Sequence, residues 1–153
     1  MKRSVILNSE LSHAIASMGH GDIMIVCDAG FPIPNSTWRV DLAVIQDIPD
    51  LETVLTAISK EMVVESVAYA AEMGANNPVL KEKVHRIFID SDFMTFPHSE
   101  ILTQMAAKAK VIVRTGAFDP WGNILLYSGV DVPKWFSKPG TIAPEIYARK
   151  MGK

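Results

Sequence analysis

The chain has 153 residues, of which 48% are hydrophobic and 21% are charged, and its formal net charge is −2. This length fits one domain with a substantial core, and the composition argues against disorder and against a nucleic-acid-binding surface. The single cysteine, Cys27, excludes an intrachain disulfide and a cysteine-rich zinc site, and it favours a cytoplasmic location. No apolar run approaches the roughly 20 residues of a membrane span, and Val5–Leu7 is too short for the core of a signal peptide.

The first half of the chain alternates predicted helices with short apolar strands. A helix is predicted from Asn8–Ser9, which can cap it, to Gly19, with one apolar stripe made of Leu7, Leu11, Ile15 and Met18. The pentad Ile23–Cys27 is apolar at every position, which predicts a central strand covered on both faces. A second strand is expected over Trp38–Val44, and a second helix begins at Asp50.

The second half continues the alternation. Val63–Ala71 is rich in both Val and Ala, and we interpret it as a strand that runs into a helix near Ala70. Pro78 suits the first turn of a further helix, and Arg86–Ile89 resembles a strand. The remaining predicted elements are a helix over 99–108 and strands at Val111–Val113 and Asn123–Tyr127. Helices alternating with short strands predict a three-layer α/β/α sandwich with a largely parallel central sheet.

The texture of the sequence changes at residue 131. Helix-breaking residues recur after that point, together with apolar and aromatic side chains: Pro133, Trp135, Phe136, Pro139, Gly140, Ile142, Pro144 and Tyr147. We therefore divide the chain into a domain over residues 1–130 and an arm over residues 131–153. The arm is expected to pack on its own domain or on a neighbouring subunit.

Two polar residues bracket the predicted central strand. His20 precedes the strand and Asp28 follows it, and both lie where the backbone is expected to turn. An imidazole and a carboxylate held rigidly in this way suit proton-transfer chemistry. Simpler roles are open as well, because a histidine after a helix-ending glycine can interact with the helix C-terminus, and Asp28 can form a turn before Gly30.

Further candidates lie where the predicted strands end, which is where open parallel sheets bind their ligands. Arg114 follows the strand Val111–Val113 and leads towards Trp121–Asn123, while His98 lies between a loop and a helix. From the residues alone, His98 resembles an ordinary helix N-terminus, Arg114 a structural or rim charge, and Trp121 a core residue. An aromatic face beside Asn is also a common way to hold a sugar ring.

Several familiar chemistries have no motif here. The sequence contains no glycine-rich phosphate loop, no Gly-x-Ser-x-Gly and no His-Glu-x-x-His. The four histidines lack metal-ligand spacing, and the only thiol is expected in a strand core. Phosphoryl transfer, serine hydrolysis, zinc catalysis and nucleotide or redox chemistry are therefore not expected, and no metal site is predicted.

Several segments together resemble the ribose pyranase and fucose mutarotase family (RbsD/FucU). These segments are Leu7–Ser9, Gly19–Asp22, Asp28–Pro34, Arg39–Ala43, Glu61–Glu65, His98, Val113–Gly116 and Pro120–Val130. The resemblance implies an RbsD-like fold and an isomerase that interconverts cyclic forms of a free monosaccharide without metal or organic cofactor. It also implies a ring-type homo-oligomer, such as a pentamer or decamer.

The same resemblance assigns roles to particular residues. It implies that His20 is the catalytic proton donor and that the sugar is bound by Asp28, His98, Trp121, Gly122 and Asn123. Opening a hemiacetal ring requires a proton on the ring oxygen and removal of one from the anomeric hydroxyl, which an imidazole can provide near neutral pH.

The segments do not all resemble one branch of the family. Asp28–Pro34 and Arg39–Ala43 resemble the ribose branch, whereas Gly122–Leu126 is similar to the fucose branch, and Trp121 replaces a tyrosine usual in the family. An indole can stack on a sugar and donate a hydrogen bond but cannot accept one. We expect a ring isomerase for D-ribose or a related aldose. The alternatives are an L-fucose mutarotase and a non-catalytic intracellular sugar-binding or transport-accessory protein.

Overall fold

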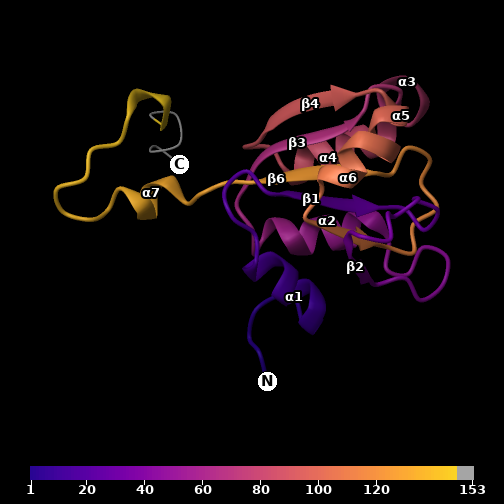
Figure 1. The fold of residues 1–153 in the computed structure, drawn as a ribbon, viewed down its shortest axis with the longest axis horizontal. Helices are drawn as coiled ribbons and strands as arrows, with labels where there is room; N and C mark the ends of the chain where they lie inside the picture. Colours follow the sequence, from indigo (N-terminus) through magenta and orange to yellow (C-terminus); the bar gives the residue numbers. More distant parts are fainter. Residues whose placement is uncertain (148–153) are drawn as a thin grey trace.

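The structure is a computed structural model that describes residues 1–147. Its centre is a six-stranded sheet with the order β2-β5-β1-β6-β3-β4 (Figure 1). The strands are β1 (Ile23–Cys27), β2 (Trp38–Asp41), β3 (Val64–Ala70), β4 (Asp92–Phe96), β5 (Val111–Arg114) and β6 (Ile124–Ser128). β6 is antiparallel to its neighbours β1 and β3, and the other pairs are parallel.

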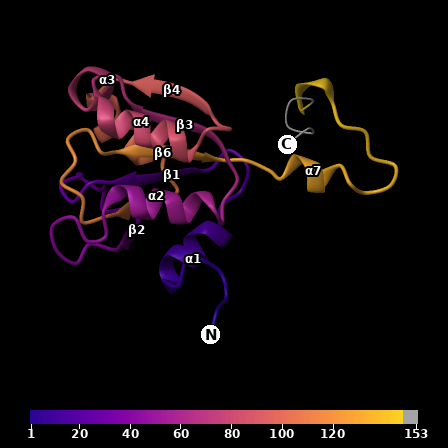
Figure 2. The same ribbon diagram turned by 180° about the vertical axis from the view of Figure 1, so that it is seen from behind.

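Helices cover both faces of the sheet (Figures 1 and 2). One face carries α1 (Ser9–Ala16), α2 (Leu51–Ser59) and α4 (Pro78–Ile87), and a short α3 (Met73–Asn76) joins β3 to α4. The other face carries a continuous helical segment made of α5 (His98–Glu100), the π-helical η1 (Ile101–Met105) and α6 (Ala106–Lys108). The predicted α/β/α sandwich with a largely parallel sheet is therefore confirmed.

The central strand β1 is buried from both sides, as its apolar pentad predicts. Met24 and Val26 belong to the core under α1, α2 and α4, whereas Ile25 and Cys27 belong to the core under the helical segment 98–108. Side chains alternate between the faces of a strand, so a strand with two covered faces has no polar position. Burial raises the pKa of the Cys27 thiol, which makes this cysteine unreactive in the folded protein.

The predicted helix starts are confirmed by their caps. The Asn8 side chain accepts a hydrogen bond from the Leu11 N–H at 2.9 Å, and Asp50 does the same for the Thr53 N–H at 2.7 Å. Pro78 is the first residue of α4, where its missing N–H costs nothing.

Several predicted boundaries are wrong. Arg86–Ile89 is not a strand, because α4 continues to Ile87 with Leu80, Val84 and Phe88 buried at helical spacing. The strand in this region is β4, which the sequence did not predict because it is a largely exposed edge strand. Lesser differences are that Leu7 precedes α1 and is exposed, that β2 ends at Asp41, and that no helix begins before Met73.

The predicted arm stands beside the domain as a separate lobe (Figures 1 and 2). It contains α7 (Val132–Trp135) and the 3₁₀ turn η2 (Glu145–Tyr147). Residues 148–153 of the predicted arm lie outside the described residues. Across residues 1–147, no helix has the length and apolarity needed to cross a membrane.

Candidate active site

Most of the predicted site residues meet at one edge of the sheet. Because β1 to β5 run in the same direction, their carboxyl ends share an edge, and the antiparallel β6 begins there. This places Asp28 after β1, His98 after β4, and Trp121–Asn123 just before β6. We call this edge, at which strands β1 to β5 end, the carboxyl edge.

Asn123 connects two of the other predicted residues. Its Oδ1 accepts a hydrogen bond from the Asp28 backbone N–H at 3.3 Å, and its Nδ2 lies 3.5 Å from Nε2 of His98. The Asn123 side chain is only 2% exposed, so both contacts are made away from bulk water. The sequence-predicted grouping of Asp28, His98 and Asn123 is therefore present within one chain.

The amide orientation of Asn123 determines the protonation pattern of His98. An N–H can only donate, so the oxygen of the Asn123 amide must face Asp28 and the nitrogen must face His98. The amide nitrogen donates, which makes Nε2 of His98 the acceptor and places the ring proton on Nδ1. His98 can then offer an N–H donor to a polyhydroxylated ligand.

The turn before β6 has a backbone that few residues adopt. Trp121 has φ 59°, in the left-handed region that is uncommon for a residue other than Gly. A Cβ at Gly122 would lie 2.7 Å from the Asp119 carbonyl oxygen, so glycine is required there. Trp121 is partly buried and packs against the cores on both faces of the sheet, which confirms a packing role for part of its surface.

Glu72 is a site residue that sequence reasoning missed. Its carboxylate oxygens accept the His98 backbone N–H at 3.2 and 3.1 Å and so hold the start of α5. Hydrogen bonds from its own N–H and from the His98 N–H lower the pKa of Glu72. Glu72 follows β3 at the carboxyl edge, which was the only sequence signal for it.

A cavity of about 550 Å³ opens next to Asp28 at the carboxyl edge. Three loops enclose it, with lining residues 28–30, 43–46, 114 and 116–120. This volume falls in the range of about 300–1,000 Å³ typical of small-molecule sites. Three of the lining residues, Val44, Ile45 and Phe118, carry exposed apolar side chains, and we call them the apolar rim.

Arg114 connects two of the loops around this cavity through contacts within the chain. Its Nε donates to the Ala29 carbonyl at 3.0 Å, and its guanidinium lies 3.1 Å from Asp41. Burial opposes ionisation of Asp41, but hydrogen bonds from Arg39 and Arg114 outweigh it and lower the pKa of this carboxyl. The structural role considered for Arg114 is thus confirmed.

At Gly116 the loop after β5 packs tightly against the loop over residues 45–48. A Cβ there would lie 2.4 Å from the Ile45 carbonyl oxygen and 2.6 Å from that of Ile48. We expect Gly116→Ala to lower the free energy of unfolding by about 2–3 kcal/mol in urea titrations, because backbone must move to make room. Gly74→Ala is the matched control, since its new Cβ would make only ordinary contacts; an equal loss in both variants would contradict the explanation.

Asp119 lines the same cavity in an unfavourable environment. Burial raises the pKa of its carboxyl, and the negative charge of Asp47 adds to the effect. The folded state therefore favours protonated Asp119, so its ionisation costs stability as the pH rises. We expect Asp119→Asn to be more stable than the parent at pH 7, with the gain vanishing below about pH 3.8, the ordinary pKa of Asp. Thermal unfolding across this range tests it, with Asp92→Asn as a control for losing one exposed charge.

His20 lies at the other edge of the sheet. It precedes β1 whereas Asp28 follows it, and a five-residue strand spans roughly 17 Å. Its Nε2 is 2.9 Å from Oε2 of Glu65, with the two side chains 43% and 30% exposed. Nδ1 of His20 has no hydrogen-bond partner within residues 1–147. One chain therefore does not bring His20 together with the other predicted site residues.

Glu65 is the second residue that sequence reasoning missed. It is the extra residue of a β-bulge, because Val64 and Ser66 pair with the adjacent residues Ser128 and Tyr127. A bulge re-aims the side chain it carries, and here the carboxylate reaches His20. A Cβ at Gly129 would lie 2.9 Å from the Glu65 Cβ, so Gly129 leaves room for this arrangement. The sequence run Glu61–Glu65 gave no indication of the bulge.

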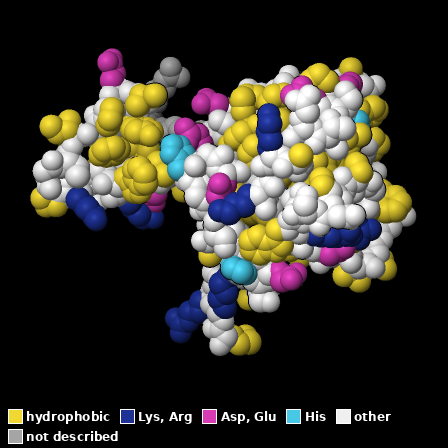
Figure 3. All heavy atoms as spheres, viewed as in Figure 1, with side chains coloured by type: hydrophobic (Ala, Val, Ile, Leu, Met, Phe, Trp, Pro, Cys, Tyr) yellow, Lys and Arg dark blue, Asp and Glu magenta, His cyan; other side chains and the backbone are white. Residues whose placement is uncertain are grey.

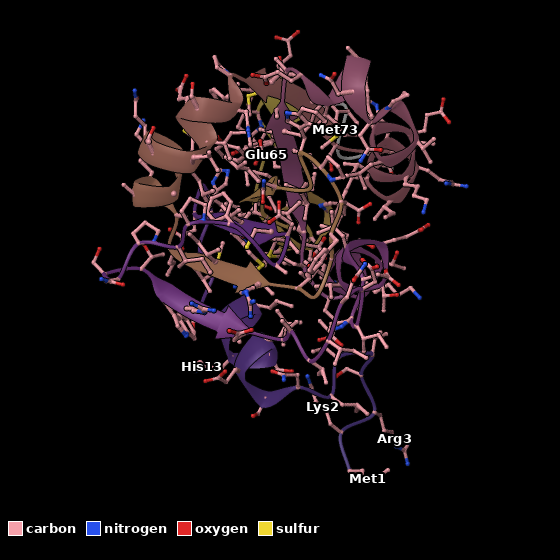
Figure 4. The ribbon with its side chains drawn as sticks, turned by 90° about the vertical axis from the view of Figure 1, so that its right-hand side faces the viewer. Met1, Lys2, Arg3, His13, Glu65 and Met73 are labelled. Atoms are coloured by element: carbon pink, nitrogen blue, oxygen red, sulfur yellow. The ribbon has the colours of Figure 1, made fainter. Side chains whose placement is uncertain are left out.

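The other two histidines are used in packing. His13 lies against Trp38 with ring centroids 5.0 Å apart, near the N-terminal segment and far from Glu65 (Figure 4). His85 stacks on Phe93 at 3.8 Å and contacts the Tyr69 hydroxyl at 2.7 Å. Burial lowers the pKa of His85. Within residues 1–147, no three His, Cys, Asp or Glu side chains are grouped so that they could hold a metal ion.

Comparisons with known proteins find similar sequences and a similar solved structure. A D-ribose pyranase 1 of Streptomyces griseus subsp. griseus is 51% identical over 99% of this chain and 100% of that protein. A D-ribose pyranase 2 of Rubrobacter xylanophilus is 54% identical over 100% of this chain and 99% of that protein. The structure of Bacillus subtilis RbsD complexed with D-ribose has a TM-score of 0.80 and 33% identity, covering 85% of this chain and 98% of that chain.

The match extends to a family model. The model of the RbsD / FucU transport protein family covers residues 1–131, which is the whole domain without the arm. The relatives and the structural neighbour together support the ribose branch over the fucose branch. The chain therefore belongs to the RbsD/FucU family.

Proposed function

We propose that this protein is a D-ribose pyranase, an isomerase that interconverts the pyranose and furanose forms of free D-ribose. The observation that carries the proposal is its likeness, over the whole chain, to two D-ribose pyranases. Asn123 links Asp28 to His98, and Asp28 also lines the cavity, so polar groups that can bind a small sugar adjoin a space that can hold one.

The reaction needs only proton transfers. The ring oxygen, which joins C5 to the anomeric carbon C1, gains a proton while the anomeric hydroxyl loses one. The bond between C1 and the ring oxygen then breaks, which gives the open-chain aldehyde. The C4 hydroxyl then attacks the aldehyde carbon, loses its proton, and the carbonyl oxygen gains one. The protons balance over the cycle, so an imidazole that alternates between its two states can serve throughout.

The residues divide this work between them. His20 moves the proton, with Nε2–H held by the Glu65 carboxylate so that Nδ1 is left for the sugar. Asp28, His98 and the Trp121, Gly122 and Asn123 turn bind the sugar hydroxyls. Glu65 acts as a positioning residue through His20.

A complete site then requires two copies of the chain. His20 and Asp28 belong to opposite edges of the sheet, so His20 must come from a neighbour whose amino edge, where β1 begins, faces the carboxyl edge of the first copy. Contacts between two different edges are head-to-tail, and such contacts close into rings when the rotation permits. This supports a ring-type homo-oligomer. The single unpaired Cys27 supports a cytoplasmic location.

Saturation-transfer NMR tests the proposed activity. The pyranose and furanose anomeric signals of D-ribose should exchange faster in the presence of the protein, in proportion to its concentration. L-fucose anomers serve as the parallel substrate. Faster exchange for fucose alone would move the protein to the mutarotase class, and saturable ribose binding with unchanged exchange would make it a binding protein.

A further inference from the structure

The arm carries apolar side chains that its own domain leaves uncovered. Trp135, Ile142 and Ile146 are 55%, 88% and 81% exposed. Figure 3 shows hydrophobic side chains gathered on this lobe, beside the domain. Exposed apolar groups gathered on one lobe are typical of a surface that meets a partner.

The arm is locally ordered even though it stands apart. Asp131 caps α7 by accepting the Lys134 N–H at 3.2 Å, and the rings of Phe136 and Tyr147 lie 5.8 Å apart. The Thr141 hydroxyl donates to the Phe136 carbonyl at 3.1 Å. A segment with its own cap and ring contact can present its exposed side chains to a partner at a lower entropic cost than a flexible tail.

The arm leaves the domain on the His20 side of the sheet. β6 runs against its neighbours, so its end, and the arm that follows, lie at the amino edge next to Glu65 and Gly129. In the assembly proposed above, this edge faces the carboxyl edge of the next copy. The arm therefore starts close to the neighbour's cavity, whose opening is surrounded by Val44, Ile45 and Phe118.

Charge favours the same encounter. Residues 131–153 contain five of the 15 Lys and Arg residues and two of the 17 Asp and Glu residues, which leaves +3 on the arm and −5 on residues 1–130. Asp28 and Asp119 are the acidic residues that line the cavity, and Arg114 is the basic one. The described part of the arm, residues 131–147, is neutral, and the positive excess belongs to residues 148–153. The opposite net charges of the whole arm and the domain favour association between copies.

We propose that the arm of one copy docks on the apolar rim of the neighbouring copy's cavity and covers the sugar site there. This inference rests on the proposed function, because it uses the head-to-tail assembly. The family model ends at residue 131, and the two full-length D-ribose pyranases extend over the arm, so the arm adds to a domain that is already complete. Its partner is a second copy of this chain.

Cross-linking between two differently tagged chains tests the docking. One chain carries Ile142→Cys and the other carries Ile45→Cys, and the two are co-expressed and treated with a flexible bismaleimide. Cys27 is buried, and burial raises the pKa of its thiol, so it should not react. We expect a product that contains both tags. The control partner carries Ile89→Cys, which is more exposed than Ile45 but lies between α4 and β4 at the amino edge.

The outcomes separate this inference from the proposed function. A cross-linking yield that is at least several-fold higher with Ile45→Cys than with Ile89→Cys supports docking. Adding Trp135→Ser to the chain that carries Ile142→Cys should reduce this yield. Equal yields with Ile45→Cys and Ile89→Cys would overturn the inference. A second test places Ile142→Cys and Ile45→Cys in the same chain. A cross-link that then forms only within that chain would also overturn it. If either of these contradicting results is obtained while the protein still accelerates ribose exchange, the arm proposal fails and the proposed function stands. If the unmodified protein does not accelerate ribose exchange, the proposed function is refuted instead.

Discussion

Replacing His20 with Ala is expected to lower the D-ribose exchange rate by about 10³-fold, because the variant loses the proposed proton donor of the reaction. His20 is exposed, and within residues 1–147 its ring hydrogen-bonds only to Glu65, so the thermal unfolding temperature should change little. Saturation-transfer NMR and calorimetry give the two readouts. Retained exchange in His20→Ala would remove His20 from the mechanism.

Mixing variants tests whether the site is shared. His98→Ala should also be nearly inactive, because it removes a ligand contact at the opposite edge. When His20→Ala and His98→Ala chains are co-expressed and assemble at random, about a quarter of the sites receive His20 and His98 from unmodified positions of adjacent copies. The mixed oligomers should therefore show about a quarter of the exchange activity of the unmodified protein. Mixed oligomers that stay inactive would show that both histidines must come from one chain.

The second large effect is expected at Glu65. Glu65→Ala should slow exchange roughly 10–100-fold, because the imidazole loses the carboxylate that fixes its orientation and tautomer. Glu65→Gln keeps the size and one acceptor oxygen, so it should lose less. The measurement is the exchange rate at saturating ribose, with KM determined separately, since a positioning residue acts mainly on the rate.

Two further readouts separate positioning from a general structural effect. Nitrogen-15 shifts of the His20 ring should report Nε2–H as the main tautomer in the parent and a mixture in Glu65→Ala. In a double-mutant cycle, Glu65→Ala should cause no additional loss in the His20→Ala background. Equal tautomer populations in parent and variant, or additive losses, would assign Glu65 to strand structure alone.

Much of the fold could be predicted because local signals and burial agree. The pentad Ile23–Cys27 is apolar throughout and proved to be the central strand, and Asn8 and Asp50 cap helices as expected. β4 was missed because an edge strand needs no continuous apolar pattern. The apolar run at 86–89 was misplaced because the last turn of an amphipathic helix and a short strand look alike without their neighbours.

The site was predictable in part. Strand-end reasoning and the family resemblance identified Asp28, His98 and Asn123, which the structure brings together. The predicted strand Ile23–Cys27 already separated His20 from Asp28 in the sequence. The sequence could not reveal that His98 and Asn123 lie on the Asp28 side, because the directions of the other strands depend on long-range pairing. Glu65 was missed for a related reason: its orientation comes from a bulge that exists only in the pairing of β3 with β6.

The position of His20 and Asp28 at opposite ends of one strand has a consequence for how such a protein behaves on dilution. A catalytic centre made from two chains exists only while those chains are associated, so specific activity should depend on protein concentration near the dissociation constant of the ring. A free chain would still contain both His20 and Asp28, but it would have no complete site and would convert no sugar. The cell could then set the turnover per chain through the amount of protein it makes, without any separate effector.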